Sequence, residues 1–228
     1  MIKLLTIILP IVFGFVSIII SASKESKRIT DQSTALKEPI LKALVKKISS
    51  ALALPNIIVL VHEVNNFNGL ATSDGTIFIT RGALNAFYEG KITAEELSSV
   101  VAHELGHVAL GHSRRRMLDF STQNALRIIL SLAISRLIPA IGTYIANFLT
   151  SVLASKLSRN DEYEADAYAA ALLIKAGIGT APQMSLLNKL EKLTTSENYP
   201  PTWLRSHPKS IDRIAAIKNL TDKWEKNS

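Results

Sequence analysis

Two histidines and a glutamate lie close together in the segment Val101–His112, which reads VAHELGHVALGH. His103 and His107 are four residues apart, so on a helix they project from one face about 6 Å apart along the axis. Both can therefore reach a single metal ion. Glu104 lies beside them, where it can take a proton from a water molecule at the metal. This H-E-x-x-H spacing is typical of zinc hydrolases in which the glutamate is the general base.

A second acidic segment can supply a third ligand. Residues 158–170 read SRNDEYEADAYAA and continue in a helical pattern that ends near Gly177. On a helix Glu162 and Asp166 lie one turn apart on one face, whereas Glu164 is rotated by about 200° from Glu162. Alone, the segment would be an exposed acidic helix start. Beside H-E-x-x-H, we expect Glu162 to bind the metal and Asp166 to accept the free N–H of a metal-bound histidine.

A third histidine, His112, fits this scheme poorly. In an H-E-x-x-H-x-x-G-x-x-H pattern the last histidine would stand at Ser113, and Leu110 occupies the position of the glycine. On a continuous helix His112 points about 180° away from His103. We therefore exclude it as a ligand unless the helix breaks at Gly111.

The metal-binding segment needs a rigid helix to hold it. Thr93 and Glu96 form a capping box, which predicts a helix that starts there and continues through the motif. Gly106 costs about 1 kcal/mol relative to Ala in the middle of a helix. We therefore expect another part of the chain to pack closely against its backbone.

The chain before this helix predicts one helix and a small sheet. Residues 33–54 have apolar positions at helical spacing, which predicts a helix that Pro55 ends. Residues 56–63 are strongly β-forming, and residues 65–72 and 76–80 flank an Asp-Gly turn, which predicts a hairpin. The expected fold class is α+β, mainly α-helical, with a small antiparallel sheet.

One strand of this sheet is a candidate for binding substrate. Proteases commonly hold an extended peptide by adding it to an exposed sheet edge. Asn68, Gly69 and Leu70 are the residues that we expect at that edge. An ordinary structural strand is the alternative interpretation.

Composition excludes several kinds of chemistry. The 228 residues are 47% hydrophobic, which is enough to bury a core, and they include no cysteine. Disulfides, thiol nucleophiles, iron–sulfur clusters and cysteine-bound zinc are therefore excluded, and a metal must rely on histidine and carboxylate ligands. The formal net charge is +7, but no nucleic-acid-binding motif accompanies it. We interpret the cluster Arg114–Arg116 as a solvated helix end.

The first residues predict export or membrane association. Residues 4–23 are uncharged and about long enough to span a bilayer. We expect residues 1–23 to be a signal peptide or a membrane anchor, 24–34 a linker and 35–228 the catalytic domain, outside the cytoplasm. Residues 137–154 are also uncharged, but a single crossing there would separate the H-E-x-x-H motif from Glu162. We therefore expect packed helices in that region.

Together these motifs resemble the M48 family of zinc metallopeptidases. The resemblance extends over residues 35–220, through HELGH at 103–107, SRNDEYEAD at 158–166 and Ser206-His207-Pro208 before Arg213. It implies a zincin-like metalloprotease domain with one Zn²⁺ bound by His103, His107 and Glu162, with Glu104 as base and Asp166 behind a histidine. It also implies that His207 approaches the site and stabilises the transition state. The chain looks more like the soluble or singly anchored members than those with several spanning segments.

These observations predict a zinc-dependent endopeptidase that acts on proteins or peptides in extracytoplasmic quality control or processing. Association with a membrane would go through residues 4–23 if they are retained. The alternative is a membrane-associated chaperone or assembly factor whose metal site is not catalytic. Replacing Glu104 separates the two hypotheses.

Overall fold

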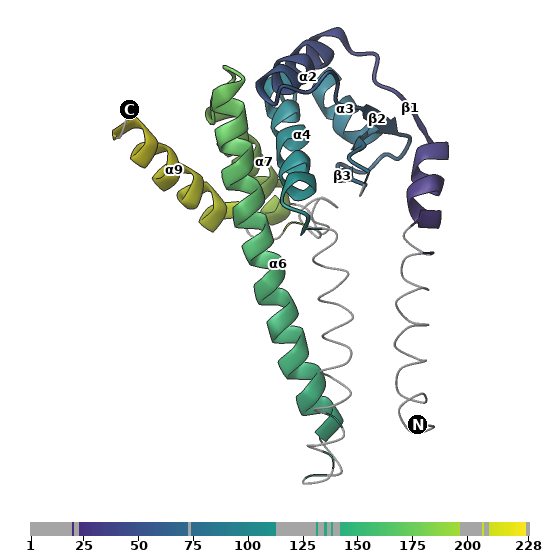
Figure 1. The fold of residues 1–228 in the computed structure, drawn as a ribbon, viewed down its shortest axis with the longest axis vertical. Coiled ribbons are helices and arrows are strands. Elements are labelled where there is room, and N and C mark those ends of the chain that lie inside the picture. The colour runs from purple at the N-terminus through teal and green to yellow at the C-terminus, as the bar shows by residue number, and fades with distance from the viewer. Residues whose placement is uncertain are drawn as a thin grey trace. The chain divides into compact units, whose positions relative to one another are not determined.

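The computed structural model describes residues 20, 23–72, 74–112, 131, 135, 138, 142–196, 207 and 210–226. Figure 1 labels most of its helices and strands. The chain forms two compact units, of which the first is Met1–Arg28 with His112–Asn160 and the second is Ile29–Gly111 with Asp161–Ser228. All residues of the candidate site belong to the second unit.

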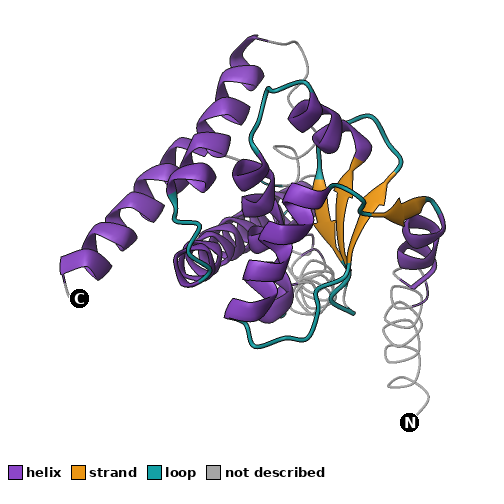
Figure 2. Cartoon of the chain, turned by 90° about the horizontal axis from the view of Figure 1, so that it is seen from above, coloured by secondary structure: helices purple, strands orange, loops and turns teal. Residues whose placement is uncertain are grey.

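The second unit contains a sheet of four strands in the order β1-β2-β4-β3, drawn side by side in Figure 2. The strands are β1 (Ser33–Ala35), β2 (Val59–His62), β3 (Gly69–Ala71) and β4 (Ile77–Thr80). The predicted hairpin is β3 and β4, and β1 also pairs antiparallel with β2. The ladder between β2 and β4 is parallel. The sheet is therefore mixed, because the returning strand of the hairpin lies between β2 and β3, which leaves β3 at an edge.

Helix α2 (Pro39–Ala51) is shorter than the predicted helix over residues 33–54. Its start is set by Pro39, which occupies the first turn, and by Glu38, whose side chain accepts a hydrogen bond from the Ile40 N–H. The residues before this boundary form β1 instead. The predicted apolar face is buried, including Leu41 and Ile48.

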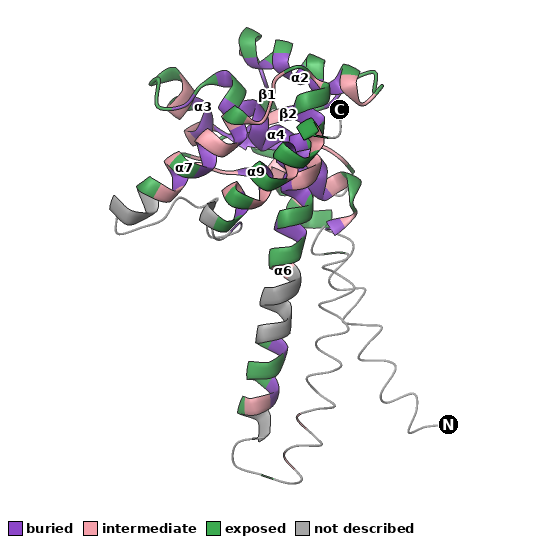
Figure 3. Ribbon diagram, turned by 90° about the vertical axis from the view of Figure 1, so that its left-hand side faces the viewer, coloured by how far each residue is buried: buried purple, intermediate pink, exposed green. Residues whose placement is uncertain are grey.

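Helices α3 (Arg81–Tyr88) and α4 (Ala94–Ala109) follow the sheet, and each begins at a threonine cap. The Thr80 side chain accepts from the Ala83 N–H, and the capping box of Thr93 and Glu96 is present as predicted. Helix α4 is buried from Glu96 to His107 and packs against α2, α7 and β3. It is therefore the central helix of this unit, as its buried colouring indicates (Figure 3).

Three further helices are α6 (Gly142–Lys175), α7 (Ala181–Ser196) and α9 (Ser210–Lys226). Helix α6 contributes its residues up to Asn160 to the first unit and the rest to the second. It ends as predicted before Gly177, whose φ of 69° stops the helix.

Several predictions concern residues outside the described part of the chain. Residues 1–19 and the cluster Arg114–Arg116 lie there, as does part of the uncharged span 137–154. Residues 23–31 are helical, so the interval that we expected to be a linker contains a helix and most of β1. Among the described residues, no helix is both long and apolar enough to cross a membrane. The domain boundaries stay predictions.

Candidate active site

Four side chains from three parts of the second unit converge on one buried point. They are His103 and His107 of α4, Glu162 of α6 and His207, which precedes α9. One ligand atom from each lies within 4.8 Å of the others, and all four residues are buried. The structure thus brings together the four residues that the sequence pattern and the family resemblance indicated.

The spacing of these atoms suits a tetrahedral metal ion. His103 Nε2 lies 3.1 Å from His107 Nε2 and 3.4 Å from Glu162 Oε2, and His107 Nε2 lies 3.4 Å from Glu162 Oε1. Two atoms that are each about 2.0–2.1 Å from a tetrahedral zinc ion are separated by about 3.3–3.4 Å. The donor set of two imidazoles and a carboxylate therefore fits zinc in both chemistry and spacing.

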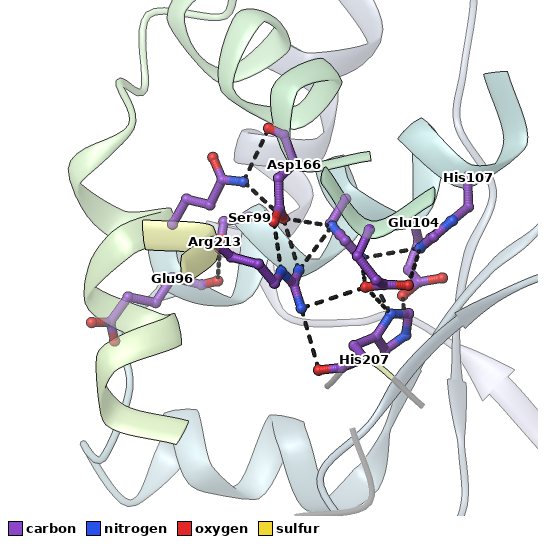
Figure 4. A network of polar contacts seen from close by, with 10 residues as sticks. Glu96, Ser99, Glu104, His107, Asp166, His207 and Arg213 are labelled. Atoms are coloured by element: carbon purple, nitrogen blue, oxygen red, sulfur yellow. Dashed lines mark hydrogen bonds and ion pairs between the residues drawn. The ribbon is translucent and has the colours of Figure 1, made fainter. Parts of the chain in front are cut away.

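His207 lies between this group and Glu104. Its Nδ1 is 2.7 Å from Glu162 Oε2 and 3.4 Å from His103 Nε2, whereas its Nε2 is 3.5 Å from Glu104 Oε1. The side chain is only 7% exposed. In Figure 4 the labelled His207 and Glu104 lie on the same side of the network. His207 therefore stands where it can interact both with a metal ligand and with the carboxylate expected to be the base.

The edge strand β3 lies directly against α4 at Glu104. A Cβ added to Gly69 would collide with Val100 Cγ1 and would lie 3.6 Å from the Glu104 side chain. Only a residue without a side chain allows this approach. The strand that we expected to bind substrate thus runs beside the carboxylate that we expected to be the base.

Asn68 is anchored to the sheet through its backbone. Its N–H donates to Thr80 Oγ1 at 2.9 Å, and its carbonyl accepts from the Thr80 N–H at 3.1 Å. Its side-chain Oδ1 is buried and has no hydrogen-bond partner among the described residues. Asn68 therefore presents an unused acceptor next to the edge strand. Leu70 pairs with Phe78 of β4. Because the pairs Asn68–Thr80 and Thr72–Thr76 on either side are joined by backbone hydrogen bonds, Leu70 directs its N–H and C=O toward β4, whereas Gly69 directs its own toward the free edge.

Gly106 allows α4 and α6 to approach closely, as its position in the helix predicted. A Cβ at Gly106 would lie 2.9 Å from the Ala165 carbonyl oxygen and 3.0 Å from its Cα. Ala165 stands between Glu162 and Asp166. The glycine therefore brings both acidic residues within reach of the histidines.

Asp166 accepts hydrogen bonds from three side chains. His103 Nδ1 is 3.0 Å from Asp166 Oδ1, and because a carboxylate only accepts, the imidazole must donate. Arg213 donates through Nε to Oδ2 at 2.6 Å and through Nη2 to Oδ1 at 2.8 Å. Gln183 adds a longer contact from Nε2 to Oδ1 at 3.4 Å and donates to the Asp166 carbonyl at 3.2 Å.

Sequence reasoning missed the roles of Arg213 and Gln183. From the sequence, Arg213 was named only as a residue after the His-Pro element, and Gln183 was given no role. One signal was available for Arg213, since a buried carboxylate such as Asp166 requires a charged or multiply donating partner. Nothing in the sequence indicated which residue would provide it.

The network shifts several pKa values. Burial alone would lower the pKa of His103, but its hydrogen bonds to Asp166 and Glu162 raise it to about 9. Burial would raise the pKa of Asp166, but the charge and hydrogen bonds of Arg213, with the bond from His103, lower it to about 2. The pKa of Glu162 is lowered because bonds from three histidines outweigh burial. Burial lowers the pKa of His207 to about 4.

Two alternatives for the third ligand lie outside the convergent group. Glu164 is exposed on α6, while Glu162 on the opposite side of the helix is buried. Helix α4 does end before Gly111, whose φ is 66°. His112 is nevertheless not one of the four residues whose ligand atoms meet at His103.

Comparisons with known proteins agree with this geometry. Residues 32–221 match the model of peptidase family M48. The metalloproteases LoiP and YcaL of Escherichia coli (strain K12) are 29% and 28% identical, each over 70% of this chain and 60% of the relative. The protease HtpX of Glaesserella parasuis serovar 5 is 25% identical over 94% of this chain and 88% of the relative. The chain thus spans about 60% of the length of the first two relatives.

Proposed function

The chain belongs to peptidase family M48, and from this premise we propose that it is a zinc-dependent endopeptidase that hydrolyses peptide bonds in proteins. The observation that carries the proposal is the buried convergence of His103, His107 and Glu162 beside Glu104. This group combines three metal-binding side chains with an adjacent carboxylate, Glu104, that is outside the ligand set. This is the arrangement that metal-assisted hydrolysis needs.

His103, His107 and Glu162 would hold one Zn²⁺. When bound, zinc supplies Lewis acidity, which polarises a carbonyl oxygen and lowers the pKa of a water molecule toward about 7. The protein prepares His103 for this role. Because its Nδ1–H is donated to Asp166 at 3.0 Å, the lone pair of Nε2 is directed toward the other ligands.

Glu104 would act as the general base and then as the general acid. Its carboxylate is buried and adjacent to the ligand group, so it can take a proton from the attacking water and deliver it to the leaving amine. His207 would stabilise the negative charge that develops on the carbonyl oxygen. This role needs a ring N–H, and Nε2, which lies 3.5 Å from Glu104 Oε1, would carry it once zinc rather than His207 Nδ1 occupies Glu162.

The peptide substrate would add to the free edge of β3 as an extended strand. Gly69 supports this hypothesis because its close approach to α4 brings the edge beside Glu104. Asn68 would offer its buried Oδ1 to a substrate N–H, and the outward-facing backbone groups of Gly69 would bond the peptide, with Leu70 beside it on the same strand. Location outside the cytoplasm and membrane association through residues 4–23 are predictions from the sequence.

The decisive test replaces Glu104 by glutamine. Glu104→Gln should retain stoichiometric zinc, because Glu104 is not one of the ligands, but should lose cleavage of casein or a peptide library by a factor of about 10² or more. The matched ligand variant His107→Ala should lose both zinc and cleavage. Full peptidase activity in Glu104→Gln would refute the mechanism. Zinc binding without any cleavage by the wild-type protein would favour a non-catalytic assembly factor.

A further inference from the structure

Among the described residues, Arg213 has the largest side chain that is less than 2% exposed. It lies near the start of α9, and the roles that the proposed mechanism assigns do not include it. A guanidinium cannot lose its charge under ordinary conditions, so burying it requires several hydrogen-bond acceptors. The positions of those acceptors indicate what the residue does.

All the described acceptors of Arg213 belong to the candidate active site. Besides the two bonds to Asp166, its Nη1 lies 3.3 Å from the His207 carbonyl oxygen and 3.4 Å from Glu162 Oε2. The labelled side chain occupies the centre of the network in Figure 4. One guanidinium therefore contacts residues from α6 and from the segment before α9.

The bond to Asp166 is a two-point contact, and this decides the orientation of the carboxylate. A single donor would leave the carboxylate free to rotate, whereas the planar fork of arginine matches both oxygens at once. The Oδ1 that Arg213 Nη2 holds at 2.8 Å is the same oxygen that lies 3.0 Å from His103 Nδ1. Arg213 thereby controls the acceptor that orients the His103 ring.

We propose that Arg213 is a positioning residue of the metal site, which fixes the Asp166 carboxylate and through it directs His103 Nε2 toward the metal. This inference rests on the proposed function, because it concerns the affinity and geometry of the same site. Arg213 itself touches neither the metal nor the substrate. Its main effect passes through Asp166, and its Nη1, 3.4 Å from Glu162 Oε2, adds a weaker direct contact with a ligand.

The test uses cobalt as the probe, in the full-length chain. Co²⁺ substitutes for zinc, and its visible absorption reports ligand number and geometry. We expect Arg213→Met to raise the Co²⁺ dissociation constant by about 10- to 100-fold, the usual effect of losing an outer partner of a ligand. We also expect a changed absorption spectrum. Arg213→Lys keeps the charge but loses the planar two-point contact. The logarithm of its Co²⁺ dissociation constant should therefore lie closer to that of Arg213→Met than to that of the wild type.

A matched control separates positioning from general loss of stability. Ile217 lies one turn further along α9 and is 1% exposed in the hydrophobic core, where it packs without being part of the polar network. Ile217→Ala should lower the melting temperature while leaving the cobalt spectrum unchanged and the dissociation constant within twofold of wild type.

The Asp166→Asn background keeps the test decisive if Arg213→Met alone does not fold, because removing both charges leaves no unpaired buried ion. In that background Arg213→Met should change cobalt affinity by less than threefold. The inference is overturned if Arg213→Met raises the Co²⁺ dissociation constant no more than Ile217→Ala does. It is also overturned if Arg213→Met weakens Co²⁺ binding in the Asp166→Asn background by threefold or more, as it would if the two effects simply added. Failure of the wild-type protein to bind Co²⁺ or Zn²⁺ would instead refute the proposed function.

Discussion

Two arginines of this protein hold carboxylates with the same geometry in opposite surroundings. Arg213 binds Asp166 through Nε and Nη2 at 2.6 and 2.8 Å, and Arg81 binds Glu63 through the same two nitrogens at 2.8 and 2.7 Å. The side chains of the first pair are 2% and 3% exposed, whereas those of the second are 33% and 37% exposed. Burial is therefore the main variable between them.

The neighbours of the two pairs differ in kind. Asp166 also bonds His103 and Gln183, so the buried pair is part of the metal site. Glu63 also accepts from the Thr34 hydroxyl at 2.7 Å, which ties it to β1 at the surface of the sheet. The same pair of hydrogen bonds therefore orients a metal-site carboxylate at Asp166, whereas at Glu63 it only holds neighbouring surface segments together.

Hydrogen-bond geometry alone does not decide how much an ion pair contributes to stability. Removing one partner of a buried pair leaves an uncompensated charge and costs about 3–5 kcal/mol. An exposed pair is solvated in either state, and its contribution is about 0–1 kcal/mol. Substitutions in the two pairs measure this difference directly.

The largest expected effect is on the folding of the metal-free protein. Arg213→Met should lower the free energy of unfolding by about 3–5 kcal/mol, because Asp166 stays buried and charged without its partner. Arg81→Met should lower it by no more than about 1 kcal/mol. Urea unfolding followed by circular dichroism measures both. Equal losses would show that burial is not what distinguishes the pairs.

Two glutamates of α6 extend the comparison to metal binding. Glu162→Gln should weaken zinc binding by more than about 100-fold, which exceeds the usual effect of losing an outer partner of a ligand. Glu164→Gln, an exposed change on the same helix, should leave the zinc dissociation constant within twofold. Competition with a chromogenic chelator measures both constants. The reverse order would move the third ligand to Glu164.

Acid titration should separate the pairs although both carboxylates have a pKa of about 2. A carboxylate whose pKa is lower in the folded state stabilises the folded protein at pH values above its unfolded-state pKa, near 4. This stabilisation is lost as the pH falls through the folded-state pKa. For Asp166, shifted from 3.8 to about 2, the contribution is about 2 kcal/mol. For Glu63 solvent screening leaves about 0–1 kcal/mol.

The measurement compares the unfolding free energy at pH 7 and at pH 3 in each variant. The wild-type protein should lose unfolding free energy between pH 7 and pH 3. Asp166→Asn should reduce this loss more than Glu63→Gln does. If Glu63→Gln flattened the pH profile more, the solvated pair would be the stronger one and the comparison would fail.

Salt should produce the smallest difference. At 0.5 M NaCl the Debye length is below 8 Å, so the few tenths of a kcal/mol lost in Arg81→Gln should disappear. The loss in Arg213→Gln should persist, because solvent ions do not reach a buried pair. Urea unfolding of both variants with and without salt provides the check. A salt-sensitive Arg213→Gln would indicate that water and ions enter the site.

Much of the site could be predicted because its determinants are local. The spacing of His103 and His107 places them on one helix face, and the spacing of Glu162 and Asp166 does the same on α6. The capping box gave the start of α4, and Gly106 indicated the close approach that Ala165 provides. Helical periodicity and backbone sterics act over a few residues, so residues that are close together in the sequence are enough to predict them.

Tertiary structure alone decided which distant residues meet. Arg213 is 47 positions from Asp166, and His207 is 104 positions from His103, so no local pattern couples them. The parallel pairing of β2 with β4 likewise depends on which strand fills the middle of the sheet. Local patterns in the amino-acid sequence specified the metal-binding helix α4 and the residue types of the metal site. Packing of α6, α7 and α9 around α4 determined their partners, because a buried charge must find its acceptors in the folded interior.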